Sequence, residues 1–155
     1  MYSQQLRHSI RNALGFRFGS LARAGRCGAA LVEAEPALGK YRDIPEVRLD
    51  VGLVLLICGN PAEALKQFEV AVAIRSEWAE AHAQRGAALA ELGRLKDAVA
   101  ALETALSLDP EHEGARADLE TIRSATGRIH RFRSADTPRL PAFKTGSAGD
   151  GSVGS

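Results

Sequence analysis

Aromatic residues are scarce in this chain, and their scarcity limits the folds that it can adopt. Phe, Trp and Tyr make up 5% of the 155 residues, whereas alanine is abundant. A β-sandwich would need more valine, tyrosine and phenylalanine at alternating positions. Small residues let helices approach one another closely, so the composition favours one helical domain.

Cysteine is also rare, with only Cys27 and Cys58 in the sequence. Their spacing matches no paired redox or zinc motif, and we expect no disulfide framework. Cys58 ends the apolar run 53–58, where a buried thiol would act as a small hydrophobe. The four histidines are scattered without the spacing of metal ligands, so the sequence predicts no metal site and no cofactor.

Long apolar runs and catalytic motifs are missing as well. The run 53–58 is far shorter than the roughly 20 residues of a membrane-spanning helix. The sequence has no glycine-rich phosphate loop, paired-histidine metal helix or nucleophile elbow, so we do not expect an enzyme. Nucleic-acid binding is disfavoured, because the central residues are acidic and the arginines lie in flanks without interleaved aromatic residues.

What the chain does contain is an internal repeat with a period of 34 residues. Small and large residues recur in the same order, with Gly52, Gly59, Ala64, Phe68 and Ala71 matching Gly86, Gly93, Ala98, Leu102 and Ala105. Such a period indicates a stacked helix-turn-helix array, whose usual work is to present a surface to another protein. The repeat therefore points to binding rather than catalysis.

The best-defined unit is 79–112. A helical pattern over 80–92 stops at Gly93, a natural C-terminal cap, and a second helix over 95–108 stops at Asp109-Pro110. The unit resembles a tetratricopeptide repeat at Gly86, Leu89, Ala98, Leu102, Ala105 and Pro110. It departs from that pattern at His82 and Arg85, where the family has tryptophan and leucine.

The resemblance implies an all-α fold, an α-solenoid of stacked antiparallel helix pairs. We expect a basic N-terminal segment at 1–44, clear repeats at 45–78 and 79–112, a capping helix at 113–126 and a disordered basic tail at 127–155. Within each clear repeat the helices should cross at the small residues, Gly52 with Ala64 and Gly86 with Ala98.

The N-terminal segment has more than one interpretation. Residues 1–28 carry five arginines and no acid, with apolar residues at helical spacing. This profile suits an organellar transit peptide, a membrane-surface amphipathic helix, or a segment that docks in the groove as a displaceable inhibitor. We prefer a degenerate first repeat, because two repeats and a cap are too few for a stable array. The expected location is cytoplasmic, or organellar if residues 1–28 are a transit peptide.

In tetratricopeptide arrays the first helix of each pair lines the concave surface. The resemblance therefore gives a candidate peptide-binding set of Leu49, Asp50, Leu53, Leu56, Ile57, Glu80, Ala83, Gln84, Ala87, Glu91 and Asp118. We expect an apolar floor with an acidic and amide rim, suited to a peptide or helix with apolar anchors and basic groups. The predicted function is that of a scaffold or adaptor, with membrane contact and oligomerisation left open. The alternative is a tetratricopeptide assembly factor with a targeting or membrane-surface helix at its N-terminus.

Some members of this family hold the C-terminal carboxylate of chaperones with lysine, arginine and asparagine side chains. The corresponding inner positions here are Leu49, Leu53, Gln84, Gly114 and Asp118, which lack that cationic set. From these positions we predict that the chain does not bind acidic chaperone tails.

Overall fold

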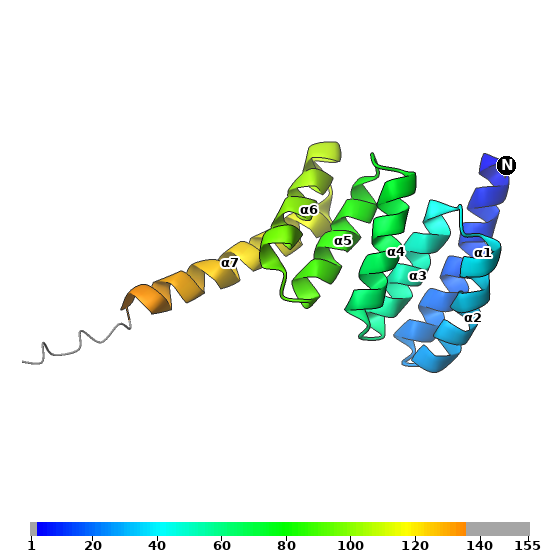
Figure 1. Cartoon of the computed structure of the whole chain (residues 1–155), viewed down its shortest axis with the longest axis horizontal. Helices are drawn as coiled ribbons and strands as arrows, with labels where there is room; N and C mark the ends of the chain where they lie inside the picture. Colours follow the sequence, from blue (N-terminus) through cyan, green and yellow to red (C-terminus); the bar gives the residue numbers. More distant parts are fainter. Residues whose placement is uncertain (1–2, 136–155) are drawn as a thin grey trace, which may run out of the picture. The chain divides into compact units, whose positions relative to one another are not determined.

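The computed structural model describes residues 3–135, which form a series of α-helices (Figure 1). The helices are α1 (Gln4–Arg23), α2 (Cys27–Lys40), α3 (Pro45–Ile57), α4 (Pro61–Ile74), α5 (Ala79–Glu91), α6 (Leu95–Leu108) and α7 (Glu113–Ala135). The helices pack in three pairs, α1 with α2, α3 with α4 and α5 with α6. The first pair meets the second mainly through α1 and α3, and the second pair meets the third mainly through α4 and α5. The predicted solenoid of helix pairs is confirmed.

The N-terminal segment forms the degenerate repeat. Phe18 of α1 is 1% exposed and lies in one core cluster with Ala34 of α2 and Val51 of α3. The apolar side of α1 is thus buried within the stack rather than turned outward. Within residues 3–135, no helix combines the length and apolar character needed to cross a bilayer.

Two glycines mark the points where paired helices cross. A Cβ atom on Gly86 would lie 2.7 Å from Leu102 Cγ and 3.3 Å from the carbonyl oxygen of Ala98. A Cβ atom on Gly52 would collide with the ring of Phe68. Gly86 therefore meets α6 at Ala98, as predicted, whereas the side chain nearest to Gly52 is Phe68, one turn beyond the predicted Ala64. Both contacts exist because glycine brings no side chain to them.

The two cysteines contradict the sequence prediction, because Cys27 and Cys58 form a disulfide with their Cα atoms 5.7 Å apart. Cys27 begins α2 and Cys58 directly follows α3. Their separation of 31 residues is close to one repeat period, so the turns of the first two helix pairs bring them to the same edge of the stack. The sequence prediction treated each cysteine alone and did not consider that turns one repeat apart lie side by side.

The first part of α7 closes the stack, as predicted for a capping helix. Ala115, Leu119 and Ile122 are buried in one cluster with residues of α5 and α6. The backbone N–H of Ala115 donates to His112 Nδ1 at 3.1 Å, and His112 Nε2 lies 2.8 Å from Glu80 Oε2. His112 therefore ties the start of α7 to α5.

The helix continues beyond its predicted end at residue 126. A single glycine such as Gly127 lowers helix stability by only about 1 kcal/mol, so it does not have to end a helix. Residues 123–135 are helical and belong to a unit separate from residues 3–122. The predicted disordered tail is thus wrong for 127–135, and the rest of it lies outside the described residues.

Candidate functional site

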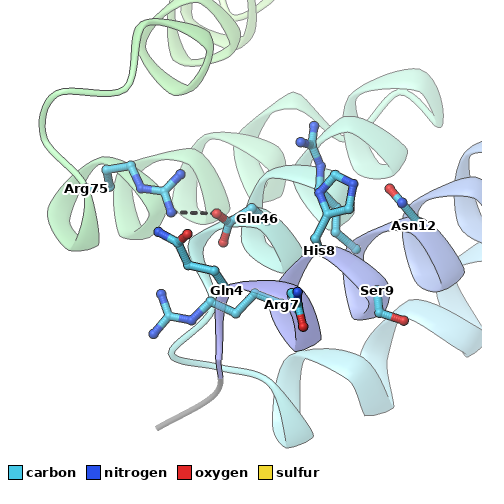
Figure 2. Close-up of a pocket in the computed structure, with 9 residues that line it drawn as sticks. Gln4, Arg7, His8, Ser9, Asn12, Glu46 and Arg75 are labelled. Carbon is cyan, nitrogen blue, oxygen red and sulfur yellow. Dashed lines mark hydrogen bonds and ion pairs between the residues drawn. The ribbon is translucent and has the colours of Figure 1, made fainter.

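A cavity of about 690 Å³ opens between the beginning of α1 and the beginning of α3 (Figure 2). The residues that line it are all polar or charged, namely Gln4, Gln5, Arg7, His8, Ser9, Arg11 and Asn12 from α1, Glu46 from α3 and Arg75 directly after α4. The cavity therefore lies where the first two repeats meet.

The local sequence explains why α1 turns a polar face to this cavity. The helix begins at a cap, where the Ser3 hydroxyl accepts from the Leu6 N–H at 3.3 Å. Its lining residues fill seven of the nine positions 4–12 and cover a broad polar face, while Leu6 and Ile10 fall on the opposite side of the helix. The apolar stripe that includes Leu14 and Phe18 packs into the core instead.

The lining of the cavity carries more positive than negative charge. Three arginines, Arg7, Arg11 and Arg75, accompany a single carboxylate, Glu46. Arg75 donates to Glu46 Oε1 at 2.5 Å, and its guanidinium lies 4.8 Å from the centre of the Trp78 ring. Glu46 is paired with Arg75, so the charged residues that α1 contributes to the lining are the cations Arg7 and Arg11, and Arg11 also lies near the Asp50 carboxylate. Guanidinium groups of this kind suit an anionic ligand.

A second cavity, of about 550 Å³, adjoins the first and shares Arg11 and Asn12 with it. Gly15 and Asp50 complete its lining. Burial raises the pKa of Asp50 to about 6; the positive charge of Arg11 opposes this rise, and Glu46 adds to it. We call this second cavity the Asp50 niche.

The predicted binding residues fall into two groups. Leu49 and Ala83 are 1% and 4% exposed, so they belong to the core and cannot reach a ligand in this conformation. Leu53 and Leu56 are half-buried against the same core cluster. Ile57 is 48% exposed, and the remaining positions are exposed or partly exposed, namely Asp50, Glu80, Gln84, Ala87, Glu91 and Asp118.

The α3 and α5 positions with access to solvent follow a common spacing. Asp50, Leu53 and Ile57 continue the spacing that starts at Glu46, and Glu80, Gln84, Ala87 and Glu91 repeat it on α5. The structure brings Asp50 beside α1, whereas the Glu80 side chain contacts Gln84 and His112. That these residues bind a peptide remains a prediction.

Sequence reasoning did not assign the α1 residues and Arg75 to a binding site. The acid-free arginine series at the N-terminus was visible, but its interpretation as a leader or repeat left its polar face without a role. Arg75 gave no signal in the sequence, because its place in the cavity depends on how α4 ends beside α3.

Comparisons with known proteins agree with the fold. A sequence profile of the family described as "Tetratricopeptide repeat" matches residues 79–112. The chain is 38% identical over 64 residues to the Hsp70-Hsp90 organizing protein of Triticum aestivum. The match covers 41% of this chain and 11% of that protein, so the chain spans about a tenth of the curated relative.

Two solved structures are similar to the chain over most of its length. One is the second TPR domain of human RPAP3 in complex with the HSP70 peptide SGPTIEEVD, at 22% identity and a TM-score of 0.65, covering 76% of this chain and 98% of that one. The other is the first TPR of Spaghetti (RPAP3) bound to the HSP90 peptide SRMEEVD, at 21% identity and a TM-score of 0.67, covering 76% of this chain and 93% of that one. At these identities the likeness establishes the fold.

The stacked pairs define a helical-repeat fold, an α-solenoid of helix pairs. More particularly, residues 79–112 match the tetratricopeptide-repeat family, and the fold is that of TPR domains.

The predicted exclusion of acidic chaperone tails is contradicted by these findings. Domains of the same fold are solved with the acidic peptides SGPTIEEVD and SRMEEVD bound. The prediction relied on inner positions of α3, α5 and α7 and overlooked the cations that α1 and Arg75 bring to the cavity. The predicted acidic rim residues of α5 and α7 lie outside this cavity, whose charged lining residues are Arg7, Arg11, Arg75 and Glu46.

Proposed function

We propose that this chain is a non-catalytic interaction module that binds a peptide carrying carboxylate groups between α1 and α3. The observation that carries the proposal is the cationic lining of the first cavity, to which α1 contributes Arg7, His8 and Arg11. Arginine side chains form short, charge-assisted hydrogen bonds with carboxylates, which favours an acidic ligand over a neutral one.

The scaffold supports this proposal because the first repeat pair is packed into the array. Phe18 and Ala22 fix α1 through the core, so the polar residues on its other side are held in place before a ligand arrives. A preformed site loses less conformational entropy on binding than a mobile segment does. We therefore assign residues 1–44 to the binding unit rather than to a leader or a displaceable inhibitor.

The test is fluorescence anisotropy with fluorescein-labelled SRMEEVD. The double variant Arg7→Gln, Arg11→Gln should weaken binding at least about tenfold, because one charge-assisted hydrogen bond contributes about 1.5–3 kcal/mol. Arg94→Gln is the matched control, because Arg94 contacts Asp97 outside the cavity and should leave affinity unchanged. Circular dichroism verifies that both variants fold.

A second peptide, SRMQQVN, replaces each carboxylate side chain with an amide. Tighter binding of SRMEEVD than of SRMQQVN, lost in the double arginine variant, supports recognition of carboxylates by α1. If the wild-type protein binds neither peptide at millimolar concentration, or if the arginine variant binds SRMEEVD as tightly as wild type, the proposal is wrong.

A further inference from the structure

A small apolar cavity of about 240 Å³ lies between α2, α3 and α4, apart from the two polar cavities beside α1. Within the described residues, α2 and α4 both pack on α3 but not on each other. The apolar lining of the cavity includes Leu31 and Leu38 of α2 and Val51 and Leu55 of α3. We call this cavity the leucine socket.

Two contacts hold the leucine socket in shape at its ends. Arg48 lies one turn before Val51 on α3, and its Nη1 donates to Gln67 Oε1 of α4 at 2.9 Å. At the opposite end, the Cys27–Cys58 disulfide joins the start of α2 to the end of α3. A partner that enters the socket therefore finds it preformed, which lowers the entropic cost of binding.

The size of the leucine socket indicates what it can hold. Pockets for drug-sized molecules measure about 300–1,000 Å³, so the socket is too small for such a ligand but has room for one large side chain. Its three leucines are only half-buried and still expose apolar surface to water. An apolar side chain that covered this surface would be bound by the hydrophobic effect.

The next repeat shows how the leucine socket can be filled from within. One period of 34 residues after Val51, the sequence has Arg85. The Arg85 side chain is half-buried and its Nε is inaccessible to solvent. An arginine is therefore accommodated at this position of the repeat, and Val51→Arg is a variant that should occupy the socket.

Two carboxylates flank the apolar lining, Glu35 on α2 and Glu63 on α4. Glu63 pairs with Lys66 at 2.7 Å. Glu35 is exposed and has no ion pair among the side chains that the structure describes. A partner with a lysine or arginine close to its apolar side chain would therefore complement this edge of the socket.

Exposed apolar side chains extend this surface along α4. Val70 and Ile74 continue the helical spacing of Glu63 and Gln67, and they are 37% and 46% exposed. From Glu63 to Ile74 this stripe covers about three helical turns. A partner helix with apolar residues at positions i, i+4 and i+7 has a matching length, and such helices commonly bind in apolar grooves.

We propose that the leucine socket and the adjoining stripe of α4 bind an amphipathic helix of a partner protein. A leucine or phenylalanine of that helix enters the socket, and a lysine or arginine one turn away lies beside Glu35. This inference goes beyond the proposed function and does not rest on it, because the site shares no residue with the cationic cavity between α1 and α3.

The experiment begins with selection from a phage-displayed library of random peptides long enough for about four helical turns. The library is first depleted on Val51→Arg, which removes peptides that bind elsewhere on the protein, and is then selected on wild type. We expect the enriched peptides to share a leucine or phenylalanine with a lysine or arginine one turn away. Enrichment of acidic peptides, or no enrichment, overturns the inference.

Fluorescence anisotropy with one enriched peptide then locates its site. Val51→Arg, and replacement of the peptide's apolar anchor by alanine, should each weaken binding at least about tenfold. Glu35→Lys should weaken it about three- to tenfold. Glu69→Lys makes the same change of charge at an exposed position of α4 outside the socket and should leave the affinity unchanged.

Circular dichroism verifies that each variant folds. If Val51→Arg does not fold, Leu38→Glu takes its place in both steps, because Leu38 is already partly exposed. Equal losses of affinity in Glu35→Lys and Glu69→Lys would mean that charge acts at a distance, and the inference fails. It fails too if the peptide binds the filled socket as tightly as it binds wild type. Neither result bears on SRMEEVD, whose binding is measured separately.

Discussion

Removing the Cys27–Cys58 disulfide should destabilise the junction between the first two repeats. The bond closes a loop with a sequence separation of 31 residues. In the chain-entropy treatment, such a loop restricts the unfolded chain by about 12 cal/mol/K, or about 3.7 kcal/mol at 25 °C. For a folded region of this size, the loss corresponds to a fall in melting temperature of about 10–15 °C.

The double variant Cys27→Ser, Cys58→Ser isolates this contribution. Urea unfolding followed by circular dichroism at 222 nm should give a free energy of unfolding about 3–4 kcal/mol below that of the oxidised wild type. A reducing agent should lower the stability of wild type to that of the variant and leave the variant unchanged. In a reducing compartment the wild-type chain would therefore behave as the serine variant does.

The location of the bond also predicts where stability is lost. The first helix pair is joined to the remainder through α3, and repeat proteins unfold pair by pair when the contact between neighbours weakens. Hydrogen exchange should therefore rise in α1 and α2 more than in α5 and α6. Equal unfolding curves for oxidised wild type and the serine variant would refute the reasoning, as would titration of two reactive thiols in the native protein before reduction.

Three further predictions concern the core and the niche. Gly86→Ala should lower the free energy of unfolding by about 1–3 kcal/mol, because the added methyl group collides with Leu102. Gly39 is a helical glycine with open space around it, so Gly39→Ala should raise the free energy of unfolding by up to about 1 kcal/mol. Thermal melts that rank the two variants in the opposite order would contradict the helix-crossing geometry. Leu102→Ala should remove about 2–5 kcal/mol, because Leu102 is fully buried, and an unchanged urea midpoint would contradict its place in the core. The folded-state pKa of Asp50 is raised from 3.8 to about 6, so folding holds this proton more tightly and wild-type stability should fall as the pH rises from about 4 to 7. Asp50→Asn should abolish that fall. Its free energy of unfolding should exceed that of wild type by up to about 3 kcal/mol at pH 8 but not at pH 4, which urea titrations at both pH values measure.

The helix pairs were predictable from the sequence because one period determines them. Gly86 and Leu102 face each other across α5 and α6 as their spacing requires, and the same relation recurs at Gly52 and Phe68. Local signals also located the cap at Gly93, whose φ of 74° lies in the left-handed region. Such features depend on residues within one repeat.

Features that depend on contacts between repeats could not be predicted in the same way. The pairing of Cys27 with Cys58 and the approach of Arg75 to Glu46 require knowing which turns stack on the same edge. The burial of Leu49 has a similar origin, because α3 has neighbours on several sides and so leaves a narrower accessible stripe than a helix with a single neighbour. Helical spacing alone overestimated the width of the groove floor.

Helix α3 belongs to two core clusters at once. Leu49 packs with α4 and α5, whereas Val47, Val51 and Val54 pack with α1 and α2. A ligand held between α1 and α3 would stabilise the N-terminal cluster by mass action. Because Leu49 lies on the same helix, part of that stabilisation would also reach the C-terminal cluster, so α3 would carry the effect of binding from one end of the array toward the other.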